Sequence, residues 1–303
     1  MLTALGSSKA PNAPVYGHVT CPDGLQMAYT DQGIGPVLLL LHGWGVDGSF
    51  FAPLQDRLAQ SCRIVTPDLR AHGQTTAGDS ELRFDTLAGD LHTLIETLDL
   101  GDVTLLGWSM GAMVAWRYIE RQGTARLAGL VVEDMSPRIV NDEHWRLGVS
   151  SGMSLEASDH HGQGMISQWP DYAASFAPRM FARSVRETHP DLVQAAVEGM
   201  AAQTGADMST LWDAMARQDF RAMLPAIDIP TLIVFGELSQ VYGPESGAYL
   251  ADLIPNAKAL GFAHSGHAPH LEEPEEFARA VSNFVQTACK ALDTRIHPEG
   301  RKS

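Results

Sequence analysis

The sequence predicts an α/β protein: a mostly parallel sheet of the eight-stranded type, helices on both of its faces, and a helical cap inserted into the core. Three observations lead to this prediction. Short apolar runs alternate with helical periodicity, one long interval has no strand pattern, and a segment near the N-terminus reads as a hairpin. With 303 residues, 45% of them hydrophobic, the chain is long enough for one large core and a subsidiary cap.

The strands of the sheet are expected at short apolar runs rich in Val, Ile and Leu. The candidates are residues 37–41, 63–65, 103–106, 127–132, 231–235 and 257–262. Ahead of them, the segment HVTCPDGLQMAYTD turns at Asp23-Gly24 and predicts an antiparallel edge to the same sheet.

Helices are expected where apolar side chains recur at spacings of three and four. One such face carries Phe84, Leu87, Leu91, Leu94, Ile95 and Leu98. Another, near the C-terminus, carries Phe277, Val281, Phe284 and Val285.

The helical insertion is predicted from the lack of a strand pattern between Pro137 and about Pro225. We therefore divide the chain into a core, residues 1–136 and 226–303, and a helical cap (lid), residues 137–225. The insertion is rich in Trp and Met, which suit adaptable apolar pockets. Most of these side chains should pack inside the insertion, and a minority should face a substrate.

Composition narrows the function classes. The formal net charge of −15 argues against nucleic acid and anionic membrane as partners. Three scattered cysteines, without a CxxC pair, favour neither a disulfide framework nor a zinc site, so we expect no metal. The N-terminal segment does not read as a secretory signal, and no apolar run is long enough to span a bilayer, so a cytoplasmic protein is expected. The sequence leaves a homo-oligomer open.

The strongest chemical signal is the segment VTLLGWSMGAMVAW, in which an apolar strand meets a helical pattern at a G-x-S-x-G motif. This context is typical of a nucleophile elbow. Gly107 and Gly111 let the strand and the helix approach closely, while Ser109 takes a strained conformation that exposes its hydroxyl. Ser109 is the predicted nucleophile.

Acyl transfer passes through an oxyanion that needs two donors already in place. One is expected from the amide of Met110, the residue after the nucleophile. The other is expected from Trp44, in the HGWG turn that follows the apolar run at 37–41. The indoles of Trp44 and Trp108 are expected to form pocket walls.

With these segments the chain resembles the α/β-hydrolase superfamily, as a serine esterase-like member. The resemblance rests on LLLLHGWG, PDLRAHGQT, GWSMGA, PTLIVFGE and SGHAPHLEEPEEFARAVSNFV. It implies that His267 is the base, whereas the flanking His264 and His270 are interpreted as structural.

The triad acid departs from the family pattern. Relatives usually carry Asp three residues after the glycine that ends the strand at 231–235, and this position is Ser239. A serine cannot supply the charge that stabilises an imidazolium. Haloalkane dehalogenases of the same fold include members with the acid at the preceding strand end. By this resemblance Asp134 is the first choice, Glu133 stands close behind, and Glu237 is a third candidate.

The predicted function is a serine hydrolase that cleaves a carboxylic ester or related acyl compound, with a small apolar acyl substrate and no cofactor. Carrier-protein methyl ester esterase, lactonase, carbon–carbon bond hydrolase and perhydrolase activities fit the same triad. For an acidic carrier, Arg179, Arg183 and Arg186 of the insertion could supply the basic contacts. A different class remains open because of Ser239: a non-catalytic member that binds a small ligand.

Overall fold

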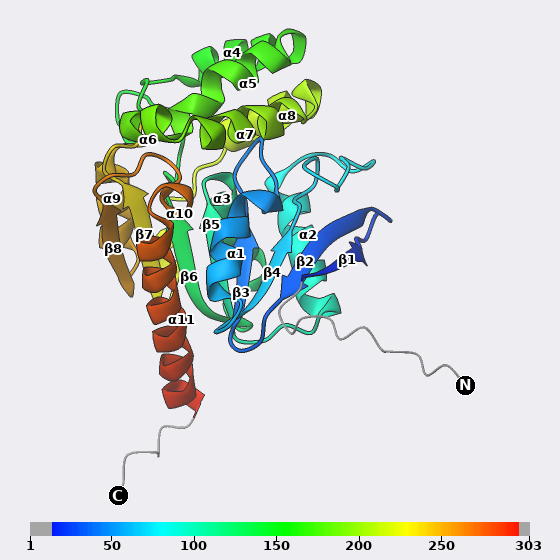
Figure 1. Cartoon of the computed structure of the whole chain (residues 1–303), viewed down its shortest axis with the longest axis vertical. Helices are drawn as coiled ribbons and strands as arrows, with labels where there is room; N and C mark the ends of the chain where they lie inside the picture. Colours follow the sequence, from blue (N-terminus) through cyan, green and yellow to red (C-terminus); the bar gives the residue numbers. More distant parts are fainter. Residues whose placement is uncertain (1–13, 297–303) are drawn as a thin grey trace, which may run out of the picture.

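The computed structural model describes the backbone of residues 14–296 and the side chains of residues 14–290. The N-terminal segment, which we expect not to be a secretory signal, lies largely outside the described residues. Its centre is one eight-stranded sheet in the order β1-β2-β4-β3-β5-β6-β7-β8 (Figure 1). The strands are β1 Val15–Thr20, β2 Gln26–Gln32, β3 Val37–Leu41, β4 Arg63–Pro67, β5 Val103–Trp108, β6 Leu127–Glu133, β7 Thr231–Gly236 and β8 Ala257–Phe262. All six predicted strand segments are therefore confirmed, and so is the fold class.

The N-terminal hairpin forms the antiparallel edge that the sequence predicts. Strand β1 pairs with β2, and β2 pairs with β4, both antiparallel, while the pairs from β4 to β8 are parallel. The connection passes through Asp23 and Gly24, and Gly24 has a φ of +86°, which suits a residue without a side chain.

Helices cover both faces of the sheet. Helix α1 (Ala52–Leu58) packs against α11 (Pro274–Ile296) on one face, and α2 (Phe84–Thr97) packs against α3 (Met110–Gln122) on the other (Figure 1). Helix α9 (Pro244–Leu253) packs on β7 and β8, and the short α10 (Pro269–Glu272) precedes α11. The two helices predicted from apolar spacing are α2 and α11, and their marked side chains face the core almost throughout.

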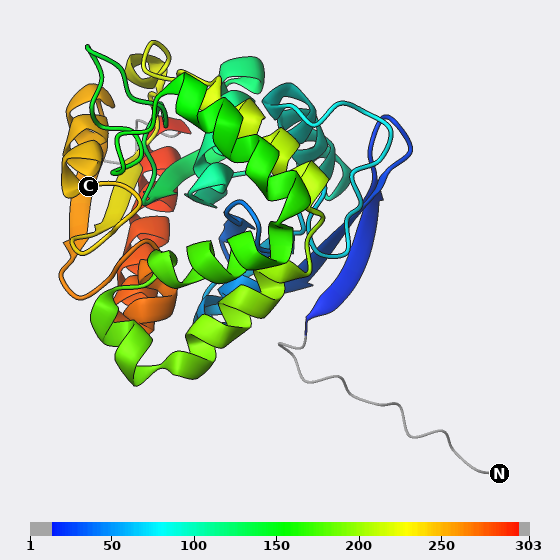
Figure 2. The same cartoon turned by 90° about the horizontal axis from the view of Figure 1, so that it is seen from above.

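The chain between β6 and β7 contains no strand among its described residues. It forms α4 (Leu155–Ser167), α5 (Trp169–Phe176), α6 (Arg183–Thr188), α7 (Pro190–Ala201) and α8 (Gly205–Ala216), with short 3-10 turns at Ala177–Met180 and Leu224–Ala226. Helices α4 to α8 lie together at one end of the sheet, as the views from the side and from above agree (Figures 1 and 2).

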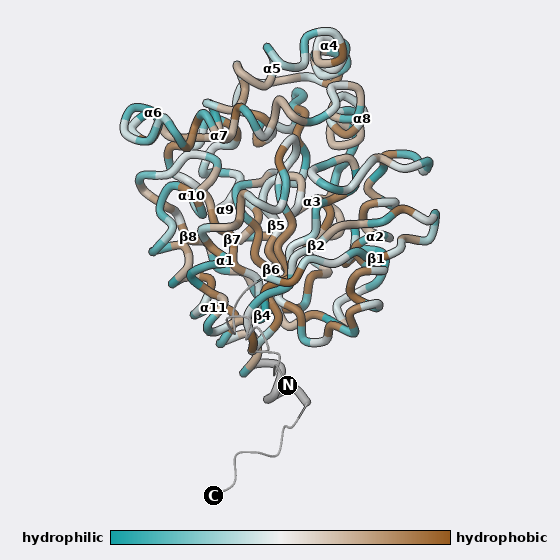
Figure 3. The backbone as a smooth tube through the Cα atoms, turned by 45° about the vertical axis from the view of Figure 1, so that its right-hand side comes forward, coloured by the Kyte–Doolittle hydropathy of each residue, from teal (hydrophilic) through white to brown (hydrophobic). Residues whose placement is uncertain are grey.

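The hydrophobic core is built around the central strands of the sheet. Hydrophobic residues gather along the central strands, as Figure 3 shows, and every residue of β5 and β6 is buried. A parallel strand covered on both faces needs this continuous apolar run. Among the helices of the described chain, none has both the length and the apolar character to cross a membrane.

Candidate active site

The G-x-S-x-G motif joins β5 to α3 through a single strained residue. Ser109 has a φ of 52° and a ψ of −119°, in a region that residues with a side chain seldom adopt. A Cβ on Gly107 would lie 2.4 Å from the Ala112 nitrogen, and one on Gly111 would lie 2.1 Å from the Leu41 oxygen. Both glycines are therefore required for the close approach of strand and helix.

His267 and Asp134 lie in contact although 133 residues separate them. The Asp134 Oδ2 atom is 2.5 Å from His267 Nδ1, and both side chains are buried. Asp134 follows β6 directly and has a φ of 42°. One ring nitrogen of His267 therefore faces a carboxylate, and Ser109 and His267 line the same pocket.

The backbone of His267 is held on both sides. Its N–H donates to the Met180 carbonyl at 2.7 Å, and its carbonyl accepts the indole N–H of Trp108 at 2.7 Å. One partner comes from the insertion and the other from the elbow. The sequence carried no signal for either contact.

The other two candidate acids lie elsewhere. Glu133 is fully buried and bonds His270, whose Nδ1 is 2.8 Å and whose backbone nitrogen is 3.0 Å from Glu133 Oε1. Glu237 is exposed. Of the three carboxylates that the sequence left open, Asp134 is the one in contact with His267. His270 is buried against Glu133, away from His267 Nδ1, and His264 is exposed.

Ser239 also contacts the acid. Its hydroxyl donates to Asp134 Oδ2 at 2.7 Å, from the loop after the neighbouring strand β7. In the sequence, Ser239 stands where relatives usually carry the triad acid. The sequence did not predict its hydrogen bond with Asp134, which follows the neighbouring strand β6.

Glu272 is a further carboxylate beside this site, and it is partly buried. It accepts the backbone N–H groups of Ala182, Gly266 and Ala268 at 2.7, 2.8 and 3.3 Å. Burial raises the pKa of Glu272 to about 7, although the three amides act in the opposite direction. It connects the insertion to the loop that carries His267.

The HGWG turn lies beside the elbow. A Cβ on Gly43 would stand 3.4 Å from the Ser109 Cβ atom, so the two backbones meet closely. The indole N–H of Trp44 donates to the Met208 carbonyl at 2.9 Å, which ties the turn to the insertion. Among the described residues, neither the Trp44 nor the Met110 backbone amide has a hydrogen-bond acceptor.

The pocket above Ser109 is narrow and mostly apolar, with about 30 Å³ of free space. The core supplies Trp44 and Trp108 among its walls, as the sequence predicted for their indoles. The rest of the lining comes from both parts of the chain: Gly43, Ser109, Val149, Phe176, Met180, Trp212, Met215, Val241, Tyr242 and His267. Of the insertion's many Trp and Met residues, three therefore face this pocket.

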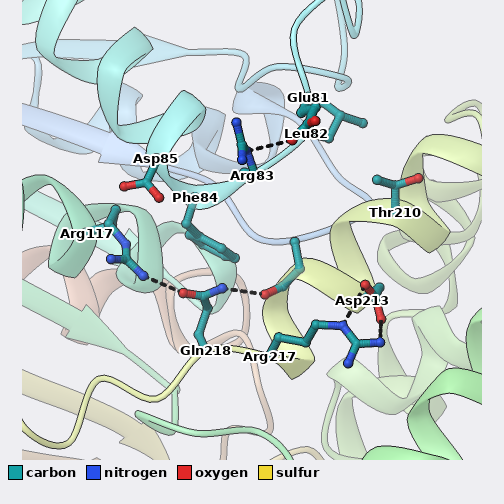
Figure 4. Close-up of a pocket in the computed structure, with 11 residues that line it drawn as sticks. Glu81, Leu82, Arg83, Phe84, Asp85, Arg117, Thr210, Asp213, Arg217 and Gln218 are labelled. Atoms are coloured by element: carbon teal, nitrogen blue, oxygen red, sulfur yellow. Dashed lines mark hydrogen bonds and ion pairs between the residues drawn. The ribbon is translucent and has the colours of Figure 1, made fainter.

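A larger cleft of about 450 Å³ lies between α2, α3 and α8 (Figure 4). Its charged side chains already have partners: Arg83 pairs with Glu81, Arg217 with Asp213, Asp85 with Arg121 and Arg117 with Glu120. Ser109 and His267 are not part of its lining. Within the described residues, no group of three or more His, Cys, Asp or Glu side chains is arranged to hold a metal ion.

Comparisons with known proteins agree with this architecture. The model of a family described as alpha/beta hydrolase fold matches residues 36–274. A non-heme chloroperoxidase, CPO-A1, from Kitasatospora aureofaciens is 32% identical, over 88% of this chain and 98% of its own. A pimeloyl-[acyl-carrier protein] methyl ester esterase from Stenotrophomonas maltophilia is 29% identical, over 86% and 96%.

Solved structures give the same result. The esterase EaEST from Exiguobacterium antarcticum superposes with a TM-score of 0.84 at 25% identity, covering 90% of this chain and all of its own. A bromoperoxidase from Bacillus anthracis superposes with a TM-score of 0.83 at 25% identity, with the same coverage. The chain therefore belongs to the α/β-hydrolase fold family.

Proposed function

We propose that this chain is a serine hydrolase that cleaves a carboxylic ester, or a related acyl compound, through an acyl-enzyme intermediate. The observation that carries the proposal is the contact of His267 Nδ1 with Asp134 Oδ2, in a pocket that Ser109 also lines. A buried carboxylate against one ring nitrogen fixes the tautomer that lets the other nitrogen accept a proton.

In this mechanism Ser109 Oγ attacks the substrate carbonyl while His267 Nε2 takes the hydroxyl proton. Asp134 stabilises the imidazolium that results. The backbone amides of Trp44 and Met110 receive the oxyanion, and their lack of other acceptors among the described residues supports this role. His267 then protonates the leaving alkoxide. Water attacks the acyl group by the same route and releases the acid.

The substrate we propose has a small apolar acyl group. The aromatic and Met side chains of the pocket favour an uncharged group, and about 30 Å³ is space for a water molecule or little more. The insertion acts as a cap in this proposal, supported by the pocket residues Phe176, Met180, Trp212 and Met215 that it supplies. We also propose a cytoplasmic protein, which the few scattered cysteines support.

The names of similar proteins suggest two further substrate classes to test, carrier-protein methyl esters and lactones. One relative is named as a methyl ester esterase of a pimeloyl carrier protein, and a solved structure of the fold is titled an enol-lactonase. Arg179 and Arg183 lie on the exposed side of the insertion, where an acidic carrier could contact them. A panel of p-nitrophenyl esters, carrier methyl esters, thioesters and lactones separates these classes by kcat/KM.

The test of the nucleophile uses a fluorophosphonate probe. We expect the probe to label the folded parent protein and not to label the Ser109→Ala variant. An unchanged circular dichroism spectrum checks that the variant is folded. Absence of labelling in the folded parent protein would favour the non-catalytic binder instead.

The test of the acid compares Glu133, the last residue of β6, with Asp134, which follows it. We expect Asp134→Asn to lower kcat for a short p-nitrophenyl ester by on the order of several thousand-fold. Glu133→Gln is the matched control, since Glu133 bonds His270 rather than His267. Near-full turnover by Asp134→Asn would refute the assignment of Asp134.

A further inference from the structure

Ser239 makes three hydrogen bonds through one hydroxyl. Its Oγ atom donates to Asp134 Oδ2 at 2.7 Å and accepts the backbone N–H groups of Val241 and Tyr242 at 3.3 and 3.4 Å. A serine hydroxyl has one hydrogen and two lone pairs. Because the two amides approach the lone pairs, the single hydrogen is directed at the carboxylate.

The neighbouring strands bring Ser239 to this position. Strand β6 pairs with β7 in parallel, and the Asp134 backbone nitrogen donates to the Val234 carbonyl at 2.8 Å. Ser239 lies in the turn after β7, where its own nitrogen donates to the Gly236 carbonyl at 3.2 Å. A side chain from this turn therefore reaches the carboxylate that follows β6.

The same carboxylate oxygen serves both neighbours. Asp134 Oδ2 accepts from Ser239 and lies 2.5 Å from His267 Nδ1. A second donor limits the rotation of the carboxylate and holds that oxygen in the direction of the imidazole. A hydrogen bond to an ionised acceptor is also stronger than one between neutral groups.

We propose that Ser239 is a positioning residue, which orients the Asp134 carboxylate toward His267. This inference rests on the proposed serine hydrolase function. Ser239 does not line the pocket that contains Ser109 and His267, so its effect passes through Asp134.

The competing explanation is a purely structural turn, in which the hydroxyl matters only because it caps the amides of Val241 and Tyr242. The two explanations differ in a double-mutant cycle, because coupling to Asp134 exists in only one of them. The cycle uses Ser239→Ala, Asp134→Asn and the double variant, with single-turnover acylation by a p-nitrophenyl ester measured at stoichiometric enzyme.

We expect Ser239→Ala to lower the acylation rate and kcat by about 10-fold with KM unchanged, and Ser239→Thr, which keeps a hydroxyl, to recover most of the rate. In the Asp134→Asn background the same Ser239→Ala change should alter the rate by less than 2-fold. An equal loss in both backgrounds, or no loss in the parent, would overturn the proposal.

Ser246→Ala is the matched control. Ser246 is buried, and its hydroxyl donates to a backbone carbonyl, that of Leu147, at 2.9 Å. We expect this variant to keep the parent rate. If the parent protein itself shows no hydrolysis and no labelling by the fluorophosphonate, the proposed function fails. If the parent is active and Ser239→Ala matches it, only this inference fails.

Discussion

The partly buried carboxylate of Glu272 should make the stability of this protein depend on pH. Burial raises its pKa from the ordinary glutamate value of 4.5 to about 7, against the opposing effect of three backbone donors. Between these two pH values the folded state binds more protons than the unfolded state. The free energy of unfolding therefore falls as pH rises through this window, and the contribution of Glu272 is level above it. A rise from 4.5 to about 7 corresponds to up to ~3 kcal/mol.

The perturbation that isolates this contribution is Glu272→Gln, which does not titrate. Its one oxygen replaces only one of the two carboxylate oxygens, of which Oε2 accepts the Ala182 amide and Oε1 accepts the Gly266 amide. Urea unfolding of both proteins is measured from pH 4.5 to 8. Any cost of the amide group is the same at every pH, so it cancels from the slope of the difference. The stability of the variant relative to the parent should rise by up to ~3 kcal/mol across the window. A flat difference would refute the reasoning.

Two further predictions concern packing and buried charge. Gly111→Ala places a methyl group 2.1 Å from the Leu41 oxygen, and should cost about 3 kcal/mol or more by urea unfolding. Its control is Gly89→Ala in helix α2, where the added methyl group meets no atom within 4 Å, and this change should stabilise the protein by up to ~1 kcal/mol. Equal effects of the two substitutions would contradict the steric argument. His270→Ala leaves the Glu133 carboxylate buried without its partner, and should cost about 3–5 kcal/mol in the same assay. A loss below about 1 kcal/mol would show that the pair is not needed.

The fold could be predicted because its signals are local. Parallel strands buried on both faces are continuous apolar runs, and helices that cover them repeat at three and four residues. Strand β4 and strand β7 extend slightly beyond the predicted runs, since a strand end is set by pairing with its neighbours rather than by its own side chains.

The candidate site could be predicted only in part from the sequence. The glycines around Ser109 mark the elbow because a tight strand-to-helix approach excludes every other residue. The choice among Asp134, Glu133 and Glu237 stayed open, since it depends on which histidine each carboxylate meets after folding. Successive residues at a strand end point in different directions, so a shift of one position decides between His267 and His270.

The hydrogen bond from His267 to the Met180 carbonyl limits how the pocket can open. We call residues 177–182 the roof of the pocket: Met180 lines the pocket, and the Ala182 amide donates to Glu272. A wide hinge motion of this segment would release the imidazole from its alignment at the moment of substrate entry. In the proposed mechanism, an ester therefore reaches Ser109 by smaller displacements, such as rotations of the Phe176 and Trp212 rings, which line the pocket. Variants that loosen the roof should act on turnover through misplacement of the base, even where they leave the passage wider.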